Sequence, residues 1–127
     1  MIRKVQTPHA PAPGGHYAQA VIFRDLIFVS GQLPIKPHTG EKVLGDIEEQ
    51  AQQVIANVLE IVQAGGGDLT TVLKCTVFIS DISLWGRFNA VFAAQFGEHK
   101  PARAVVPTRE LHHGFLVEMD AIAAKIS

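Results

Sequence analysis

Residues 46–80 read DIEEQAQQVIANVLEIVQAGGGDLTTVLKCTVFIS, and this stretch predicts an amphipathic helix followed by a β-strand. Asp46 and Glu49 have the spacing of a capping box at a helix start. The apolar residues that follow recur every three or four positions and form one stripe along a helix: Ile47, Ala51, Val54, Ile55, Val58, Ile61 and Val62. The three glycines at 65–67 end the helix.

The flanking sequence predicts the remaining elements. Residues 1–16, rich in Pro and Gly, indicate an extended or looping arm. A second helix has a predicted buried stripe formed by Leu84, Phe88, Val91, Phe92 and Phe96. The predicted strands are Tyr17–Phe23, Leu26–Gln32, Val72–Ser80, Ala102–Thr108 and Phe115–Lys125. The expected order is β-β-α-β-α-β-β, an α+β domain with two helices packed on one face of a mixed sheet.

Alternation assigns faces to two of the strands. In the strand over 72–80, one face carries Leu73, Cys75, Val77 and Ile79. In the last strand, the residues predicted to face the helices are Phe115, Val117, Met119, Ala121 and Ala123. The opposite face carries Leu116, Glu118, Asp120 and Ile122. Because Leu and Ile lie on this uncovered face, we expect another subunit to cover it.

Composition limits the classes of function. The 127 residues predict one domain over 1–127. Eleven basic and twelve acidic residues leave a net charge of −1, which provides no electrostatic footprint for nucleic acid. Residues 1–10 do not resemble a signal peptide, and no apolar run approaches the ~20 residues of a membrane span. With a single cysteine, Cys75, a reducing cytoplasmic location is expected.

Most standard catalytic motifs are absent. There is no dinucleotide or Walker-type fingerprint, and the glycines at 65–67 follow a helix, as a helix stop does. His112 and His113 are adjacent in a loop, where neighbouring side chains point apart, so solvated histidines are a better interpretation than a metal site. Cys75 lies on an apolar strand face and is expected to be a buried hydrophobe rather than a nucleophile.

Two charged residues in apolar strands are stronger candidates for functional residues than the histidines or the cysteine. Arg103 begins a strand, and its rigid guanidinium suits a carboxylate ligand, although an ordinary surface or interface ion pair fits the spacing too. Glu118 lies between Val117 and Met119, where a carboxylate needs a partner or a raised pKa. A structural salt bridge to a neighbouring strand is the alternative for Glu118.

Taken together, the motifs make the chain resemble the RidA/YjgF/L-PSP family of imine deaminases over nearly its whole length. The matching segments are GHYAQA at 15–20, VSGQLP at 29–34, TG at 39–40, QA at 50–51, NV at 57–58, VLKCTVF at 72–78, NAVF at 89–92, PAR at 101–103 and VEMDAIA at 117–123.

The resemblance implies a chorismate-mutase-like fold and a homotrimer with sites between subunits. It implies hydrolysis of reactive enamines and imines, such as 2-aminoacrylate and 2-iminopropanoate, to a keto acid and ammonia, without a metal or an organic cofactor. By this resemblance Arg103 anchors the substrate carboxylate and Glu118 positions water. The implied substrate-binding residues are Tyr17, Ser30, Gly31, Asn89, Arg103 and Val105.

The chain departs from the usual family pattern at several positions, which bears on substrate preference. His16 stands where Pro is common, and the segment after Arg103 reads Ala104-Val105-Val106-Pro107 in place of a common Ser-Cys-Val or Ser-Thr-Val. His112 replaces the Pro of a Leu-Pro pair. Two other functions remain open: a regulatory trimer that binds small carboxylates without turnover, and the endoribonuclease activity associated with some family members.

Overall fold

In the computed structural model, which describes residues 1–126, helix α1 spans Ile47–Ala64, within the segment that the sequence predicts as helix. The Glu49 amide donates to Asp46 Oδ1 at 2.9 Å and so satisfies one of the free N–H groups of the first turn. Gly65 caps the other end, where its amide donates to Ile61 O at 3.0 Å. Every residue of the predicted apolar stripe of this helix is buried.

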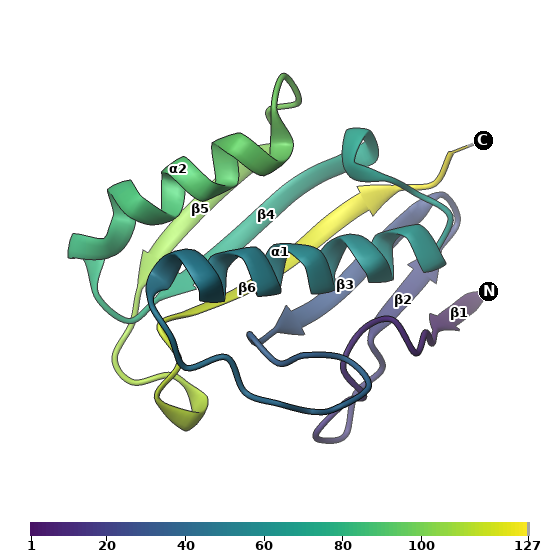
Figure 1. Ribbon diagram of the computed structural model, residues 1–127. Coiled ribbons are helices and arrows are strands. Elements are labelled where there is room, and N and C mark those ends of the chain that lie inside the picture. The colour runs from purple at the N-terminus through teal and green to yellow at the C-terminus, as the bar shows by residue number, and fades with distance from the viewer. Residues whose placement is uncertain (127) are drawn as a thin grey trace.

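Six strands form one mixed sheet. They are β1 (Ile2–Val5), β2 (Ala20–Phe23), β3 (Leu26–Gln32), β4 (Val72–Ile79), β5 (Ala102–Pro107) and β6 (Val117–Ala124). Their order across the sheet is β1-β2-β3-β6-β4-β5, and every pair is antiparallel except β4 with β5. Both helices lie over one face of the sheet (Figure 1). The predicted α+β architecture is therefore confirmed.

Helix α2, Trp85–Phe96, connects the parallel strands β4 and β5. A one-turn 3₁₀ helix over Ile82–Leu84 precedes it, and Asp81 Oδ1 accepts the Ser83 amide at 2.9 Å there. The apolar stripe of α2 faces the sheet, with Phe88, Phe92 and Phe96 buried. Strand β5 lies at the sheet edge, a position where Pro107 can end the strand without leaving a ladder bond unmade.

The sequence-based prediction was wrong in two places near the N-terminus. Strand β1 lies within the segment predicted as an arm, where it pairs with β2, Ile2 opposite Phe23. Strand β2 begins at Ala20 and not at Tyr17, and the side chain of Gln19, just before it, holds the arm. The hairpin between β2 and β3 is present, and Arg24 takes the left-handed conformation (φ 56°) in which glycine is the usual residue.

The predicted face of Leu73 was also wrong. Leu73 is exposed, whereas Cys75, Val77 and Ile79 are buried. The reason is an irregularity between Val72 and Lys74, where the register of β4 against β6 shifts by one residue and turns the start of β4 over.

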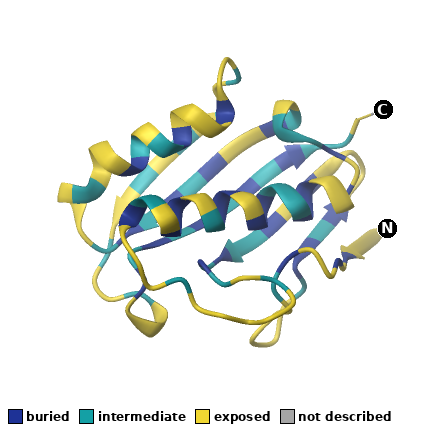
Figure 2. Cartoon of the chain, viewed as in Figure 1, coloured by how far each residue is buried: buried dark blue, intermediate teal, exposed yellow. Residues whose placement is uncertain are grey.

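The two faces of the sheet differ in how they are covered. The core lies between the helices and one face, as the dark blue segments of Figure 2 show. On the other face, Phe28 is paired across the sheet with Val21 and Ile122 and remains 42% exposed. Exposed Phe23 and Leu26 lie on this open face too. Within residues 1–126, no helix combines the length and apolarity of a bilayer crossing.

Candidate functional site

A cleft of about 1060 Å³ opens between the N-terminal arm and the end of β3. Residues of the arm and of the loop that follows β3 form its walls, and His112 and His113 belong to its lining. Four of the predicted site residues also line it: Tyr17, Ser30, Gly31 and Glu118. We call these four residues the cleft group.

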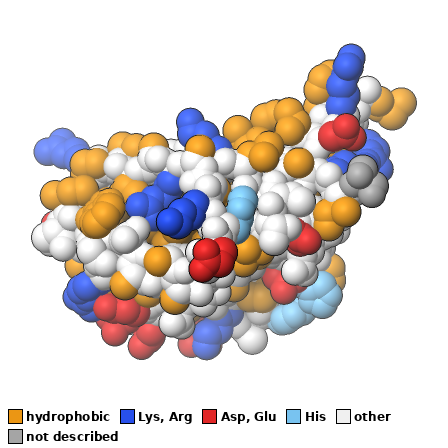
Figure 3. All heavy atoms as spheres, turned by 90° about the horizontal axis from the view of Figure 1, so that it is seen from above, with side chains coloured by type: hydrophobic (Ala, Val, Ile, Leu, Met, Phe, Trp, Pro, Cys, Tyr) orange, Lys and Arg blue, Asp and Glu red, His pale blue; other side chains and the backbone are white. Residues whose placement is uncertain are grey.

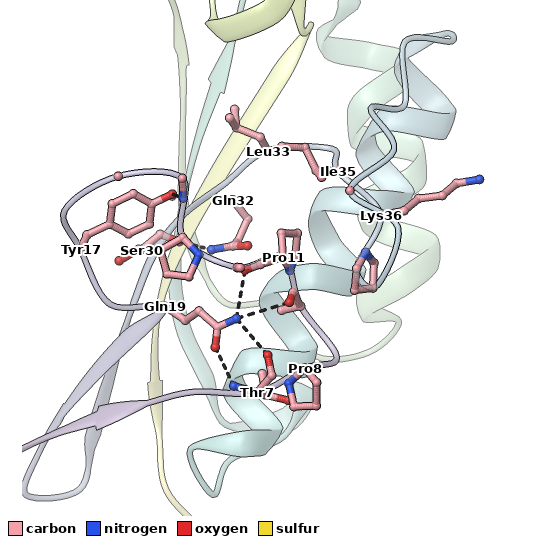
Figure 4. A pocket seen from close by; sticks show the side chains of 18 of the residues that line it. Thr7, Pro8, Pro11, Tyr17, Gln19, Ser30, Gln32, Leu33, Ile35 and Lys36 are labelled. Atoms are coloured by element: carbon pink, nitrogen blue, oxygen red, sulfur yellow. Dashed lines mark hydrogen bonds between the residues drawn. The ribbon is translucent and has the colours of Figure 1, made fainter.

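A buried side chain, Gln19, holds the arm against the cleft (Figure 4). Its Oε1 accepts the Thr7 amide at 2.7 Å, and its Nε2 donates to the carbonyl oxygens of Thr7 and Pro11, both at 3.0 Å. A primary amide can satisfy donors and acceptors at once, so one side chain replaces the strand pairing that this proline-rich segment lacks. The wall of the cleft is therefore held by specific hydrogen bonds.

The two hydroxyl groups of the cleft group already have backbone partners. Ser30 Oγ donates to Ala18 O at 2.7 Å, which leaves its lone pairs as acceptors. Tyr17 Oη accepts the Gly14 amide at 3.2 Å, which leaves its phenolic proton as a donor, and the side chain is half exposed. Each hydroxyl can therefore offer a ligand one further hydrogen bond of defined polarity.

Glu118 occupies the space above Gly31. A Cβ atom built on Gly31 would lie 3.2 Å from Glu118 Cδ and still closer to Oε2, so a side chain at position 31 would displace the carboxylate from its present place. Partial burial raises the pKa of Glu118, the nearby His112 charge lowers it, and Asp120 raises it. Among the described residues, Glu118 has no salt bridge or hydrogen-bond partner, contrary to the structural alternative considered from the sequence.

The remaining predicted site residues lie elsewhere. Arg103, on edge strand β5, is in register with buried Cys75 and therefore faces the helices. Its guanidinium carbon lies 4.7 Å from the centroid of the Phe92 ring and 5.8 Å from that of Trp85, a cation–π arrangement. Within residues 1–126, no acidic side chain forms a salt bridge with Arg103.

Val105 and Asn89 accompany Arg103. Val105 follows Arg103 by two positions, so it faces the same way, and it packs against the core. Asn89 is half-buried on α2, one turn from Trp85. We call Asn89, Arg103 and Val105 the edge group.

One copy of the chain does not bring the two groups together. Val117 and Met119 are buried under the helices, so Glu118 between them points to the opposite face. Arg103 points to the helix side and does not line the cleft. The two proposed central residues, Arg103 and Glu118, therefore lie on opposite faces of the same sheet.

The structure also tests what the sequence predicts for residues outside both groups. Burial raises the pKa of the Cys75 thiol to about 12, which suits the predicted hydrophobe and not a nucleophile. His112 and His113 are exposed, as a solvated loop predicts, but they line the cleft, which sequence reasoning missed. The role of Gln19 was missed as well. Its one sequence signal is a polar side chain between alanines at the start of a predicted apolar strand.

Comparison with known proteins identifies the family. The family model described as Endoribonuclease L-PSP matches residues 7–125. A RutC family protein of Pyrococcus abyssi is 45% identical over 119 residues, which cover 94% of each chain. A protein of Rattus norvegicus named 2-iminobutanoate/2-iminopropanoate deaminase is 40% identical over 126 residues, which cover 98% of this chain and 92% of the relative.

A solved structure extends the match to three dimensions. The Escherichia coli protein TdcF, solved with bound serine, superposes with a TM-score of 0.92 at 35% identity, over 98% of this chain and 99% of that one. The predicted chorismate-mutase-like α+β fold thus agrees with the solved structures of relatives. Because the family model matches nearly all of the described chain, the protein belongs to the RidA/YjgF/L-PSP family.

Proposed function

We propose that the protein is a deaminase that hydrolyses 2-imino acids and their enamine tautomers to keto acids and ammonia. The observation that carries the proposal is the state of Arg103, which lies against two aromatic rings and has no acidic partner among the described residues. Such a guanidinium can accept a substrate carboxylate through two charge-assisted hydrogen bonds. The deaminase name of the 40% identical rat relative supports the same reaction.

The reaction requires little of the protein besides positioning. Once Arg103 holds the carboxylate, a water molecule adds to the C=N carbon and passes a proton to Glu118, which is half-buried and has a raised pKa. Glu118 returns this proton to the nitrogen, which gives a carbinolamine. The hydroxyl proton of the carbinolamine then passes to the nitrogen, the C–N bond breaks, and ammonia leaves as the carbonyl forms. An enamine substrate first takes a proton at carbon to become the imine. The proposal assigns no step to a metal or an organic cofactor.

The proposed site forms between two copies of the chain, because the cleft group and the edge group face opposite sides of one sheet. The open sheet face supports assembly, since large apolar side chains such as Phe28 are exposed there. A homotrimer is the proposed assembly, with the cleft group of one copy meeting the edge group of its neighbour. A cytoplasmic location remains part of the proposal.

The test is ammonia release from enzymatically generated 2-iminopropanoate. One charge-assisted hydrogen bond contributes roughly 1.5–3 kcal/mol, so Arg103→Ala should lower kcat/KM on the order of 10²-fold or more. Arg87→Ala is the matched control, because Arg87 is exposed and its guanidinium is already engaged in a bidentate ion pair with Glu48. Turnover by Arg103→Ala at the level of Arg87→Ala would refute the anchor.

A binding protein without turnover is the second candidate, and the serine held by the solved relative TdcF favours it. In that case Arg103 would bind serine or a keto acid, and calorimetry would detect binding without ammonia release from the imine. Endoribonuclease activity has weaker support, since the net charge is −1 and basic and acidic side chains are interspersed on the face seen in Figure 3. RNA cleavage that is lost in Arg103→Ala would favour it.

A further inference from the structure

A fully buried polar side chain on α1, that of Asn57, is bonded to the loop that follows β3 and forms one wall of the cleft. Its Nδ2 donates to Leu33 O at 3.1 Å and to Ile35 O at 2.9 Å. Its Oδ1 accepts a hydrogen bond from Gln53 Nε2 at 2.9 Å. An asparagine amide has two hydrogens to donate, and this one uses both on carbonyl oxygens of the cleft wall.

These two bonds fix the place of the whole loop relative to the core. Backbone hydrogen bonds, such as that from the Lys36 amide to Glu41 O at 2.8 Å, fold residues 33–43 onto themselves. Within residues 1–126, the bonds from Asn57 are the hydrogen bonds that join residues 33–43 to α1. Because Asn57 lies in the packed core, the loop takes its position from the core and not from its own turns.

The wall that Asn57 holds presents apolar side chains to the cleft. Leu33, Ile35 and Pro37 line the cleft and are partly buried. Lys36, between them, forms an ion pair with Glu41 at 3.7 Å and points away from the cavity in Figure 4. The cleft group supplies the polar atoms of the proposed reaction, so this wall suits the apolar substituent on the imine carbon.

We propose that Asn57 is a positioning residue that holds Leu33 and Ile35 where they contact the apolar side chain of a 2-imino acid. The inference rests on the proposed function, because such a side chain enters the cleft only if 2-imino acids are the substrates. Apolar contact grows with the length of the substituent. The position of the wall therefore matters more for a long side chain than for a methyl group.

The experiment compares ammonia release from 2-iminopropanoate, which has a methyl side chain, and from 2-imino-4-methylpentanoate, which has an isobutyl side chain. An amino acid oxidase generates both in the assay. In Asn57→Ala, the ratio of the isobutyl KM to the methyl KM should rise about five- to tenfold, with kcat for each substrate within about twofold of the wild type. A ratio equal to that of the wild type would overturn the inference.

Two further variants test the same point if Asn57→Ala does not fold. Asn57→Ser keeps one donor hydrogen, which cannot bond both carbonyl oxygens, so the KM ratio should rise by less than in Asn57→Ala. Ile35→Ala keeps the backbone carbonyl that Asn57 binds and shortens the wall itself, so it should raise the ratio too. A wild-type ratio in either variant would overturn the inference.

Two control variants on α1 separate positioning from stability. Gln53→Ala removes the third hydrogen bond of Asn57 and leaves both bonds to the loop. Val58→Ala opens a cavity in the core beside Asn57 and lowers stability without removing a bond to the loop. Both should keep the wild-type KM ratio. A rise in Val58→Ala as large as that in Asn57→Ala would attribute the effect to stability and overturn the role of Asn57.

A binding measurement separates this inference from the proposed function. Calorimetry with pyruvate and 4-methyl-2-oxopentanoate, the two keto acid products, should show the same change in the ratio of Kd values in Asn57→Ala. A changed Kd ratio with no ammonia release by the wild type would reject the deaminase and retain the role of Asn57 in holding the wall. Normal ammonia release with unchanged KM and Kd ratios would reject the role of Asn57 and retain the deaminase.

Discussion

The cleft group and the edge group are built on different physical principles. In the cleft, backbone hydrogen bonds hold the arm and the hydroxyls in place, and the absence of a side chain at Gly31 makes room for Glu118. At the edge, Arg103 lies on a strand with one neighbour and is held by aromatic rings. The cleft group therefore offers polar atoms of defined orientation, whereas the edge group offers one cation that has no acidic partner within residues 1–126.

This difference suggests separate chemical roles for the two groups, anion binding and proton transfer. A single cation without an acid partner suits the binding of an anion, whereas a carboxylate with a raised pKa suits proton transfer. Because the two groups face opposite sides of the sheet, the proposed site requires a second copy of the chain.

The largest loss of turnover is expected when assembly is prevented, because the cleft group of one copy then cannot meet the edge group of another. Phe28→Asp places a charge in the centre of the open apolar face, so the variant should be monomeric by light scattering and lose turnover to the same extent as Arg103→Ala. Ile82→Asp, at a residue 54% exposed in the turn before α2, should remain assembled and active. A monomeric Phe28→Asp that retains turnover would show that one copy suffices.

A smaller loss is expected from disturbing the cleft group alone. Gly31→Val suits the strand backbone but fills the space of the Glu118 carboxylate, so kcat/KM should fall about 10- to 100-fold with assembly unchanged. In a Glu118→Ala background the same change should cost little more, as a double-mutant cycle would detect. Additive losses in that cycle would mean that Gly31 acts through something other than Glu118.

The smallest effect concerns stability against pH. Since burial raises the pKa of Glu118 above its ordinary 4.5, the folded protein binds this proton more tightly than the unfolded chain. The stability of the wild type should therefore fall relative to that of Glu118→Gln as pH rises through and above 4.5, in urea unfolding at fixed protein concentration. If the stability of the wild type relative to Glu118→Gln did not change with pH over this range, the assignment would be refuted.

Much of the fold could be predicted because local patterns agree with the final packing. The stripe and caps of α1 indicate its position without reference to any other element. Strand β1 was missed because its four residues have no alternation and pair with β2 only after the arm folds back. The orientation of Leu73 was missed because it depends on a register shift against β6, which local spacing does not encode.

The candidate site was predictable as a set of residues but not as an arrangement. Arg103 and Glu118 can be identified from local sequence, because each is a charged residue between apolar neighbours in a predicted strand. That they face opposite sides follows from pairing, Arg103 with Cys75 and Glu118 with Phe78, which requires the sheet order. The cleft roles of Gln19 and His112 depend on contacts across the arm and the turn, beyond the reach of spacing rules.

The most direct test of the account mixes two defective variants. Arg103→Ala lacks the anchor, and Gly31→Val lacks a working cleft, but when the two are mixed at random in one assembly some sites join an intact edge group to an intact cleft group. If each site joins two copies, such mixed assemblies should recover about one quarter of the wild-type ammonia release per chain. If both groups serve the same copy, activity should not exceed the mean of the two parent variants, and that result would contradict the account.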